Sequence, residues 1–292
     1  NDLVLRERLN DVLDAGLAGK MTLVSAPAGF GKTTQILAWL QSLQIQDTYK
    51  IGWFSIDAND NDLARFVAYY CGAIKHNYPK FEIPPTEFLS AQSAAVESIL
   101  TASINEIARN SGAFILVLDD YHLIDTQAIH EALAFVLEHQ PGHMHLVLTT
   151  RADPPLPLAL LRGRGQLNEL RQSDLKFSTP EAVEFLSDVM GFSLGKTEIE
   201  TLSRQTEGWI TGLQMAAVSM RGQQDLAGFV RSFEKGHRYI LDYLMEEVVQ
   251  QQDAFILNFL LQTSILERFS APLCDYILDV GNSNMGTFSP TD

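Results

Sequence analysis

"SAPAGFGKTT", residues 25–34, lies between a short apolar run and a helical pattern, and it is the most informative part of the sequence. It has a small residue, four free positions and then Gly-Lys-Thr, which is the Walker A pattern of a phosphate-binding loop. Small residues let successive backbone N–H groups surround an anion. Ala26 stands at the motif's first glycine, so only Gly29 and Gly31 are free to take unusual backbone angles. We therefore predict a phosphate-binding loop between a strand and a helix.

The residues of this loop have distinct expected roles. Those expected to bind the phosphates of a nucleotide are Ala28, Gly29, Phe30, Gly31, Lys32, Thr33 and Thr34. Lys32 would bring a positive charge to the β- and γ-phosphates, and the hydroxyl of Thr33 would ligate Mg²⁺. The structural alternative is an ordinary glycine turn before a helix, which the position of the motif after a strand disfavours.

A second motif ends the apolar run of residues 114–118, FILVL, with the acidic pair Asp119 and Asp120. Such a run is typical of a strand that is buried on both faces. Beside a Walker A loop, the pair is a Walker B signature. Asp119 is expected to hold Mg²⁺ from its outer coordination shell, and Asp120 to orient or deprotonate the attacking water. The alternative is that the carboxylates cap a helix that starts near Asp125.

A third candidate follows the predicted strand HLVLTT, residues 145–150, which ends in Arg151. Ligands of open α/β sheets bind at the carboxyl ends of the strands. Arg151 is therefore expected to contact a γ-phosphate, and Thr149 or Thr150 to hydrogen-bond the attacking water. A surface arginine after a strand is the alternative.

The order of apolar runs predicts an α/β domain followed by helices. Residues 1–180 alternate short β-rich runs with helical patterns, as in a parallel sheet with crossover helices. The predicted strands are Met21–Ser25, Ile51–Asp57, Phe114–Asp119, His145–Thr150 and Leu175–Phe177. From Ser178, which with Glu181 predicts a capping box, the strand signal fades. Further helical patterns cover roughly residues 197–207, 209–221, 238–251 and 253–265.

The composition restricts the possible partners. The 292 residues are 46% hydrophobic and 20% charged, as in ordinary globular proteins, and a net charge of −15 disfavours non-specific binding to DNA. Cys71 and Cys274 form no metal-ligand pattern and are expected to be reduced. No apolar run reaches about 18 residues, so we expect a cytoplasmic protein without a membrane segment. Because the sequence begins with Asn1 rather than Met, we expect it to be a fragment.

Three arginines, Arg162, Arg164 and Arg171, form a local basic cluster in this acidic sequence. They could supply an arginine finger to a neighbouring subunit. They could instead form salt bridges, which is the interpretation we favour. The candidate acidic partners are Asp153, Glu169 and Asp174.

Five blocks of the sequence are distinctive together. They are LVSAPAGFGKTT (23–34), WFSIDANDND (53–62), LVLDDYHLI (116–124), LVLTTRADPPLPLALLRGRGQLNEL (146–170) and TEGWITGLQMAA (206–217). These blocks resemble the ATPase region of the large maltose-regulator-like transcription factors of bacteria, which belong to the STAND class of signal-transduction ATPases. They follow the family's order and spacing, and the resemblance extends over residues 2–280.

The resemblance implies a fold and a domain division. The family has a P-loop domain with sheet order 5-1-4-3-2, then a helical domain and a winged-helix-like domain that closes over the nucleotide. By position, residues 1–177 would form the P-loop domain and residues 178–233 the helical (lid) domain. Residues 234–292 would form a winged-helix-like segment, truncated in this chain.

The resemblance also implies a switch. In the family the ADP-bound form is closed and inactive, whereas inducer and ATP open the protein, which then forms homo-oligomers and activates transcription. Slow hydrolysis of ATP resets the switch. DNA would be bound only through a carboxyl-terminal helix-turn-helix domain that is absent from this chain. Two alternatives remain open: a constitutive AAA-like ATPase, and an assembly scaffold that binds ATP without significant hydrolysis.

The family's site residues can be carried over by position. The matching residues are Lys32 and Thr33 for phosphate and Mg²⁺, Asp119 and Asp120 for the acidic pair, and Arg151 for the γ-phosphate sensor. Leu3 and Val4, with Arg6 or Arg8, would lie in the amino-terminal stretch near the adenine.

Two further positions are implied in the second half of the chain. Gly208 and Trp209 fall where related ATPases place a glycine-containing motif close to the nucleotide, although Trp209 also fits a core aromatic. His237 could reach the β-phosphate of bound ADP, but we favour a solvated histidine at a helix start.

Overall fold

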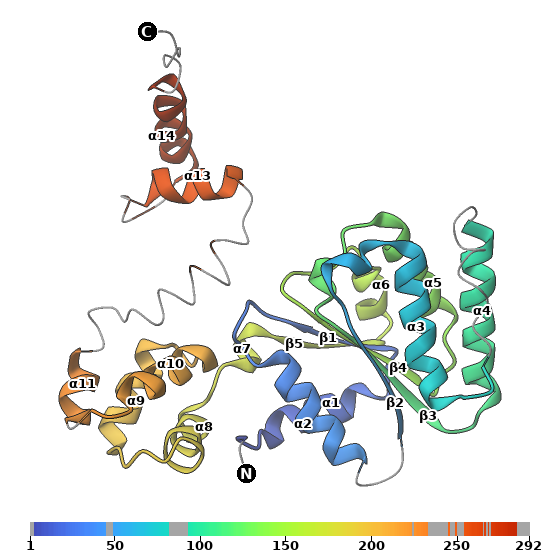
Figure 1. Ribbon diagram of the computed structural model, residues 1–292, viewed down its shortest axis with the longest axis horizontal. Coiled ribbons are helices and arrows are strands. Elements are labelled where there is room, and N and C mark those ends of the chain that lie inside the picture. Colours follow the sequence, from blue (N-terminus) through green and yellow to red (C-terminus); the bar gives the residue numbers. More distant parts are fainter. Residues whose placement is uncertain are drawn as a thin grey trace. The chain divides into compact units, whose positions relative to one another are not determined.

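The computed structural model describes residues 3–44, 49–81, 93–223, 225–232, 254–264 and 270–284, and the single positions 245, 249, 266 and 268. Its contacts divide the chain into two compact units, Asn1–Glu234 and Lys235–Asp292. The first unit holds the sheet and helices α1 to α11, and the second holds α13 and α14 (Figure 1).

A five-stranded parallel sheet forms the centre of the first unit. In chain order its strands are β1 (Met21–Ser25), β2 (Tyr49–Ser55), β3 (Ala113–Asp119), β4 (Met144–Thr150) and β5 (Leu167–Arg171). They lie in the order β2-β3-β4-β1-β5, so the expected order 5-1-4-3-2 is confirmed (Figure 1). β4 therefore lies between the strand that precedes the phosphate loop and the strand that ends in the acidic pair.

The last predicted strand is wrong. The fifth strand is β5, Leu167–Arg171, whereas Leu175 ends the short helix α7 (Gln172–Leu175) and Phe177 lies outside any helix or strand. β5 pairs only with β1 at the edge of the sheet, and most of its residues are half-buried. An edge strand of this kind can carry polar side chains, so its sequence lacks the apolar run that marks the central strands.

Two hydrophobic cores cover the two faces of the sheet. Alternate side chains of β3 point to opposite faces. Phe114, Leu116 and Leu118 pack in one core, with residues of α3, α4 and α5, while Ile115 and Val117 pack in the other, with residues of α1 and α2. This double burial explains why β3 has the continuous apolar sequence predicted for it.

The first helix precedes β1, and the other helices around the sheet lie between successive strands. In chain order the helices are α1 (Glu7–Gly16), α2 (Lys32–Gln44), α3 (Leu63–Asn77), α4 (Ser93–Arg109), α5 (Gln127–His139) and α6 (Leu158–Gly163). Short 3-10 helices, Ala58–Asn61 and Tyr121–Leu123, follow β2 and β3.

A helical segment follows the sheet within the first unit. Its helices are α8 (Thr179–Glu184), α9 (Lys196–Gln205), α10 (Ile210–Met220) and α11 (Leu226–Ser232), and a π-helical turn, Phe185–Val189, extends α8. Ser178 and Glu181 form the predicted capping box at the start of α8. The four helices and the turn are referred to below as the helical segment.

The second unit contains α13 (Ala254–Thr263) and α14 (Ala271–Asn284). Of the helix predicted over residues 238–251, only positions 245 and 249 are among the described residues, and His237 lies outside them. No helix within the described parts of either unit is long and apolar enough to cross a membrane.

Candidate nucleotide-binding site

The phosphate loop has the backbone that the sequence predicts. It joins β1 to α2, which begins at Lys32. Gly29 and Gly31 have φ angles of +77° and +70°, in the left-handed region that favours glycine. At Gly29 space is a second constraint, because an added Cβ would lie 2.5 Å from Oγ1 of Thr211. The two glycines expected to take unusual angles therefore do so.

Lys32 is held inside its own loop. Only 7% of the residue is exposed, and Nζ donates hydrogen bonds to the carbonyls of Ala26 (2.9 Å) and Pro27 (3.1 Å). Burial lowers the pKa of the amine, and the nearby carboxylate of Asp120 counteracts this by favouring the charged form. A phosphate oxygen entering the loop could replace the two neutral acceptors with an anionic one.

Asp119, at the end of β3, contacts α2 and β4 at the carboxyl edge of the sheet. Its Oδ1 accepts hydrogen bonds from the hydroxyls of Thr33 (3.0 Å) and Thr149 (2.5 Å), and the residue is 4% exposed. Burial raises the pKa of the carboxyl, although both hydroxyl donors favour its charged form. The two predicted metal-binding residues, Thr33 and Asp119, are thus in direct contact.

This oxygen pair fits Mg²⁺. Mg²⁺ prefers oxygen ligands, and nucleotide enzymes bind it through one or two protein oxygens together with substrate phosphates. The described residues contain no group of three or more His, Cys, Asp or Glu side chains that would form a metal site by themselves. Thr33 and Asp119 would therefore hold the ion together with a nucleotide.

Asp120 occupies an unusual backbone position. Its φ and ψ are 60° and 41°, a left-handed conformation that is uncommon outside glycine, and its N–H donates to Oγ1 of Thr149 (2.9 Å). The carboxylate lies 3.7 Å from Nδ1 of His122. The carboxylate interacts electrostatically with Lys32, as does the positive charge of Arg151.

His122 is a site residue that our sequence reasoning missed. Its Nδ1 is buried and has no hydrogen-bond partner among the described residues. Burial, together with the positive charges of Arg151 and Lys32, lowers the pKa of the imidazole to about 4, so it is neutral at neutral pH. The available signal was its place two residues after the acidic pair, in the block LVLDDYHLI.

Arg151 follows β4, and its charge disfavours protonation of both Lys32 and His122. The two threonines before it are engaged with the protein, because Thr149 donates to Asp119 and the hydroxyl of Thr150 donates to the carbonyl of Ala152 (2.7 Å). The predicted sensor arginine thus lies within electrostatic range of Lys32 and His122.

Two arginines of the basic cluster form the favoured salt bridges. Arg162 donates through Nε to Glu169 (2.8 Å), and Arg171 pairs with both Asp153 and Glu169. These hydrogen bonds lower the pKa of Glu169 to about 2, against the effect of burial. Arg162 and Arg171 are therefore neutralised by acidic side chains of the same chain.

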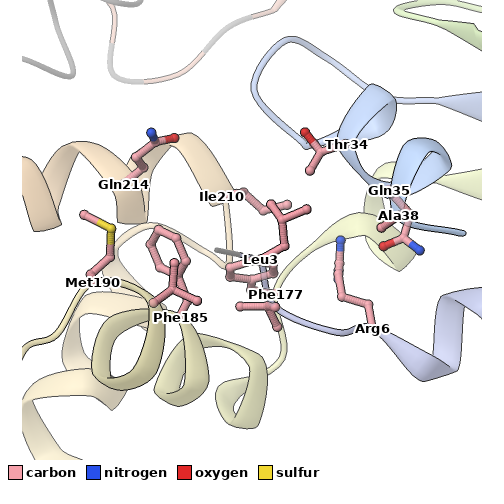
Figure 2. Close-up of a pocket in the computed structure, with 13 residues that line it drawn as sticks. Leu3, Arg6, Thr34, Gln35, Ala38, Phe177, Phe185, Met190, Ile210 and Gln214 are labelled. Atoms are coloured by element: carbon pink, nitrogen blue, oxygen red, sulfur yellow. The ribbon is translucent and has the colours of Figure 1, made fainter. Parts of the chain in front are cut away.

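A cavity of about 340 Å³ lies beside the phosphate loop, between α2 and the helical segment (Figure 2). Gly31, Thr34, Gln35 and Ala38 of the loop and α2 line one side, and Phe177, Phe185, Val189, Met190, Ile210 and Gln214 line the other. Leu3, Val4 and Arg6 of the amino-terminal stretch complete the wall. The mostly apolar lining and the contact with the phosphate loop suit a planar base.

Of the two arginines expected near this cavity, Arg6 lines it and Arg8 does not. Arg6, 6% exposed, donates to Glu181 (3.1 Å) and to the carbonyl of Leu175 (2.8 Å) and lies over the ring of Phe177. Arg8 donates to the other oxygen of Glu181 (3.0 Å). Both arginines therefore tie the amino-terminal stretch to the start of α8.

Gly208 lies at the turn before α10 and does not line the cavity. Its φ is +72°, and an added Cβ would lie 2.7 Å from the carbonyl oxygen of Phe177. Trp209, which follows it, packs against the core that contains α1 and α2, and its indole donates to the carbonyl of Ala28 (3.1 Å). Both interpretations of Trp209, a packed aromatic and a residue at the nucleotide loop, thus apply.

Comparisons with known proteins reveal relatives of the chain. Over 276 residues and 92% of its length, the chain is 35% identical to the HTH-type transcriptional regulator MalT of Yersinia enterocolitica, and equally to that of Yersinia pestis. Residues 245–285 match the model of the MalT winged helix domain. This chain is homologous to part of the MalT regulators. It spans only about 30% of the length of these MalT relatives.

Solved structures show the same fold at low sequence identity. One is a STAND ATPase with a tetratricopeptide repeat sensor from Pyrococcus horikoshii. The match covers 95% of the present chain and 37% of the ATPase chain, with 15% identity and a TM-score of 0.53. The Aeropyrum pernix ORC1 protein, solved in complex with DNA, matches 98% of the chain and 78% of its own, with 16% identity and a TM-score of 0.52. The MalT homology and this P-loop ATPase fold together support a nucleotide-dependent regulatory module.

Proposed function

We propose that the chain is an ATP-binding, slowly hydrolysing switch module of a MalT-like transcriptional regulator. In this proposal residues 1–177 bind the nucleotide, residues 178–233 form a lid and residues 234–292 belong to a winged-helix-like domain. The observation that carries the proposal is the hydrogen bond between Thr33 of the phosphate loop and Asp119 of the acidic pair. It joins the two motifs whose cooperation Mg²⁺-dependent phosphate chemistry requires.

Nucleotide binding would use three parts of the first unit. The base enters the cavity beside α2, where the amino-terminal stretch and the helical segment supply apolar walls. The amides of residues 28–34 bind the phosphates, and the Lys32 ammonium exchanges the carbonyls of Ala26 and Pro27 for phosphate oxygens. Bound Mg²⁺, held by Thr33 and Asp119, would neutralise developing charge on the phosphates.

Hydrolysis would depend on Asp120. Its carboxylate, which follows β3 on a left-handed backbone and interacts electrostatically with Lys32, would orient an attacking water and accept its proton. Because His122 is neutral, its imidazole, 3.7 Å from this carboxylate, does not neutralise the carboxylate as an imidazolium cation would. Arg151 would bind the γ-phosphate and stabilise charge in the transition state.

The regulatory part of the proposal rests on the MalT homology. The ADP form would be the closed resting state, the ATP form would self-associate, and hydrolysis would return the chain to rest. DNA would be contacted by another domain of the longer protein. Winged-helix similarity at residues 245–285 and the STAND fold support this assignment.

The proposal is tested by comparing two lysines that both donate to backbone carbonyls. Lys32→Ala should weaken Mg·ATP binding by roughly tenfold to a hundredfold, because it removes a charged hydrogen bond to phosphate. Lys20→Ala, at the opposite end of β1, should leave the Kd unchanged. Isothermal titration calorimetry measures both. Equal ATP affinities in Lys32→Ala and the unchanged chain would contradict the proposal.

Phosphate release then separates the switch from its two alternatives. A switch is expected to turn over less than about once per minute, whereas a constitutive ATPase would reach about 1–100 s⁻¹, the range of kinases. ATP-dependent oligomers in light scattering without any phosphate release would instead indicate the assembly scaffold.

A further inference from the structure

The start of α10 is fastened to the back of the phosphate loop by three hydrogen bonds. The indole Nε1 of Trp209 donates to the carbonyl of Ala28 (3.1 Å). Thr211 donates twice to the carbonyl of Gly29, through its hydroxyl (3.0 Å) and through its backbone N–H (3.1 Å). We call residues 207–211 the docking turn.

These bonds determine where two loop amides point. In a trans peptide the carbonyl and the following N–H point in opposite directions, and the described residues contain no cis peptide. The Ala28 carbonyl shares its peptide with the N–H of Gly29, and the Gly29 carbonyl shares its peptide with the N–H of Phe30. With both carbonyls held by the docking turn, both N–H groups must face the other side of the loop.

The phosphate loop and the docking turn both have backbone features that allow their close contact. At Gly29 an added Cβ would lie 2.5 Å from Oγ1 of Thr211 and 2.8 Å from Nε1 of Trp209, so only glycine lets the docking turn approach. The docking turn itself is sharply bent, since Glu207 and Gly208 have φ angles of 50° and 72°. Its direction is fixed by the N–H of Phe177, which donates to the carbonyl of Gly208 (2.8 Å).

We propose that Trp209 and Thr211 are positioning residues for phosphate binding. They hold the carbonyls of Ala28 and Gly29 turned outward, so that the amides of Gly29 and Phe30 are preorganised to receive an anion. Docking of the helical segment and binding of the phosphates then stabilise each other, because both require the same peptide orientation. This inference rests on the proposed function, since it assumes that the loop binds nucleotide phosphates.

Two substitutions remove the side-chain donors and keep the side-chain bulk. Trp209→Phe removes the indole N–H and retains an aromatic ring, and Thr211→Val removes the hydroxyl and retains the backbone bond. Each should weaken Mg·ADP binding to the full chain by roughly fivefold to tenfold, because a loop peptide is released to rotate. Adenosine, which has no phosphate, should bind each variant as it binds the unchanged chain.

Matched controls come from equivalent bonds elsewhere. Trp53→Phe removes an indole N–H that donates to Ser55 on the edge strand β2, and Thr201→Val removes a hydroxyl that donates to Thr197 within α9. Both should leave the affinity for Mg·ADP unchanged. The inference is overturned if Trp209→Phe and Thr211→Val bind Mg·ADP like the unchanged chain, or if they lose adenosine affinity to the same degree.

Hydrogen exchange tests the reciprocal effect without any substitution. Mg·ADP should slow exchange of the Thr211 amide by about fivefold or more, whereas adenosine should not. An unaltered Thr211 rate with Mg·ADP bound would refute the coupling. If Lys32→Ala abolished Mg·ADP binding while the two docking-turn variants did not weaken it, the inference alone would fail. If the unchanged chain bound no Mg·ADP, the proposed function would fail with it.

Discussion

The two ends of the parallel sheet each hold a lysine and a histidine whose pKa values are lowered, chiefly by burial. Lys20 and His145 lie at the amino ends of β1 and β4, and Lys32 and His122 lie beyond the carboxyl ends of β1 and β3. Each end thus has one lysine and one histidine, so the two ends differ in the hydrogen-bond partners of these side chains.

At the amino end both side chains have hydrogen-bond partners in neighbouring elements. Lys20 donates to the carbonyls of Leu137 (2.7 Å) and Glu138 (2.9 Å) in the last turn of α5, where a helix leaves its carbonyls without partners. His145 contacts the carbonyl of Gly19 through Nδ1 (3.0 Å) and the hydroxyl of Thr22 through Nε2 (2.8 Å). These bonds join neighbouring elements and stabilise the fold.

At the carboxyl end the hydrogen-bond partners are local to the loop or missing among the described residues. Lys32 bonds to carbonyls of its own loop, Nδ1 of His122 has no partner among the described residues, and Asp120 has a strained backbone. Buried polar groups normally find hydrogen bonds, and exceptions concentrate at functional sites. The contrast indicates that the carboxyl end of the sheet is suited to a ligand, whereas the amino end stabilises the fold, and five predictions test this contrast.

The largest effect is expected at Asp120. Asp120→Asn should reduce phosphate release by about 10²–10⁴-fold, because the amide cannot accept the proton of water. The free energy of unfolding should be unchanged or slightly higher, since Asn tolerates the left-handed region at least as well. Colourimetric phosphate assays and urea denaturation measure the two effects. Asp11→Asn, at an exposed position of α1, is the control, and an equal loss of activity in both variants would remove Asp120 from the proposed chemistry.

The next effect separates the two histidines by stability. His145→Leu should lower the free energy of unfolding by about 1–3 kcal/mol, because it removes the buried hydrogen bonds with the Thr22 hydroxyl and the Gly19 carbonyl. His122→Leu should cost less, since among the described residues its Nδ1 has no hydrogen bond to lose. Urea denaturation of the nucleotide-free chain gives both values. A larger loss for His122→Leu would reverse the proposed difference between the two ends.

A smaller effect is expected at Gly31, whose φ is +70°. Gly31→Ala should cost about 1–2 kcal/mol of stability and also weaken nucleotide binding, because a non-glycine residue resists the left-handed region. Gly19→Ala, at the amino end, would place Cβ 2.9 Å from the carbonyl oxygen of Gln166 and should reduce stability only. Thermal denaturation and ATP titration of the two variants measure this. Unchanged ATP affinity in Gly31→Ala would contradict the predicted backbone of the loop.

The smallest effect is a dependence on pH. The folded chain keeps His122 neutral down to about pH 4, whereas the unfolded chain binds a proton near its ordinary pKa of about 6.5. The unfolded state therefore binds more protons in this window, and stability should fall as the pH is lowered from about 6.5 to 4. His122→Leu should remove this part of the pH dependence.

Nucleotide binding should change the pKa of one of the two histidines and leave that of the other unchanged. Phosphates would offset the charges of Arg151 and Lys32, so Mg·ADP should raise the pKa of His122 and leave that of His145 unchanged. The imidazole C–H signals in NMR titrations report each group. Equal responses of the two histidines to Mg·ADP would show that the nucleotide does not bind at the carboxyl end.

The sequence was most informative at positions where few residue types satisfy the structural requirement. The phosphate loop, the acidic pair and the buried strand β3 follow from glycine conformation, charge and double burial, and all three lie where predicted. β5 was missed because an edge strand needs no apolar run, and the predicted Ile51–Asp57 strand is shifted to Tyr49–Ser55.

Side-chain partners were harder to predict than elements. Arg6 and Arg8 are two residues apart on one stretch, and only packing against Glu181 and Phe177 determines which of them reaches the cavity. The contact of Thr211 with the phosphate loop joins residues 182 positions apart, which no local pattern encodes. The role of His122 depends on an unpaired nitrogen, a property of the fold rather than of the sequence.

The strand order has a consequence for how the molecule folds. β1 pairs only with β4 and β5, and the contact between Thr22 and His145 spans 123 positions. During synthesis the loop that follows β1 therefore leaves the ribosome long before its supporting strand exists. Such distant pairing slows folding and exposes the apolar face of β1 in the nascent chain. A chain that ended before β4 would contain the entire glycine-rich motif but would lack the strand that supports the phosphate loop.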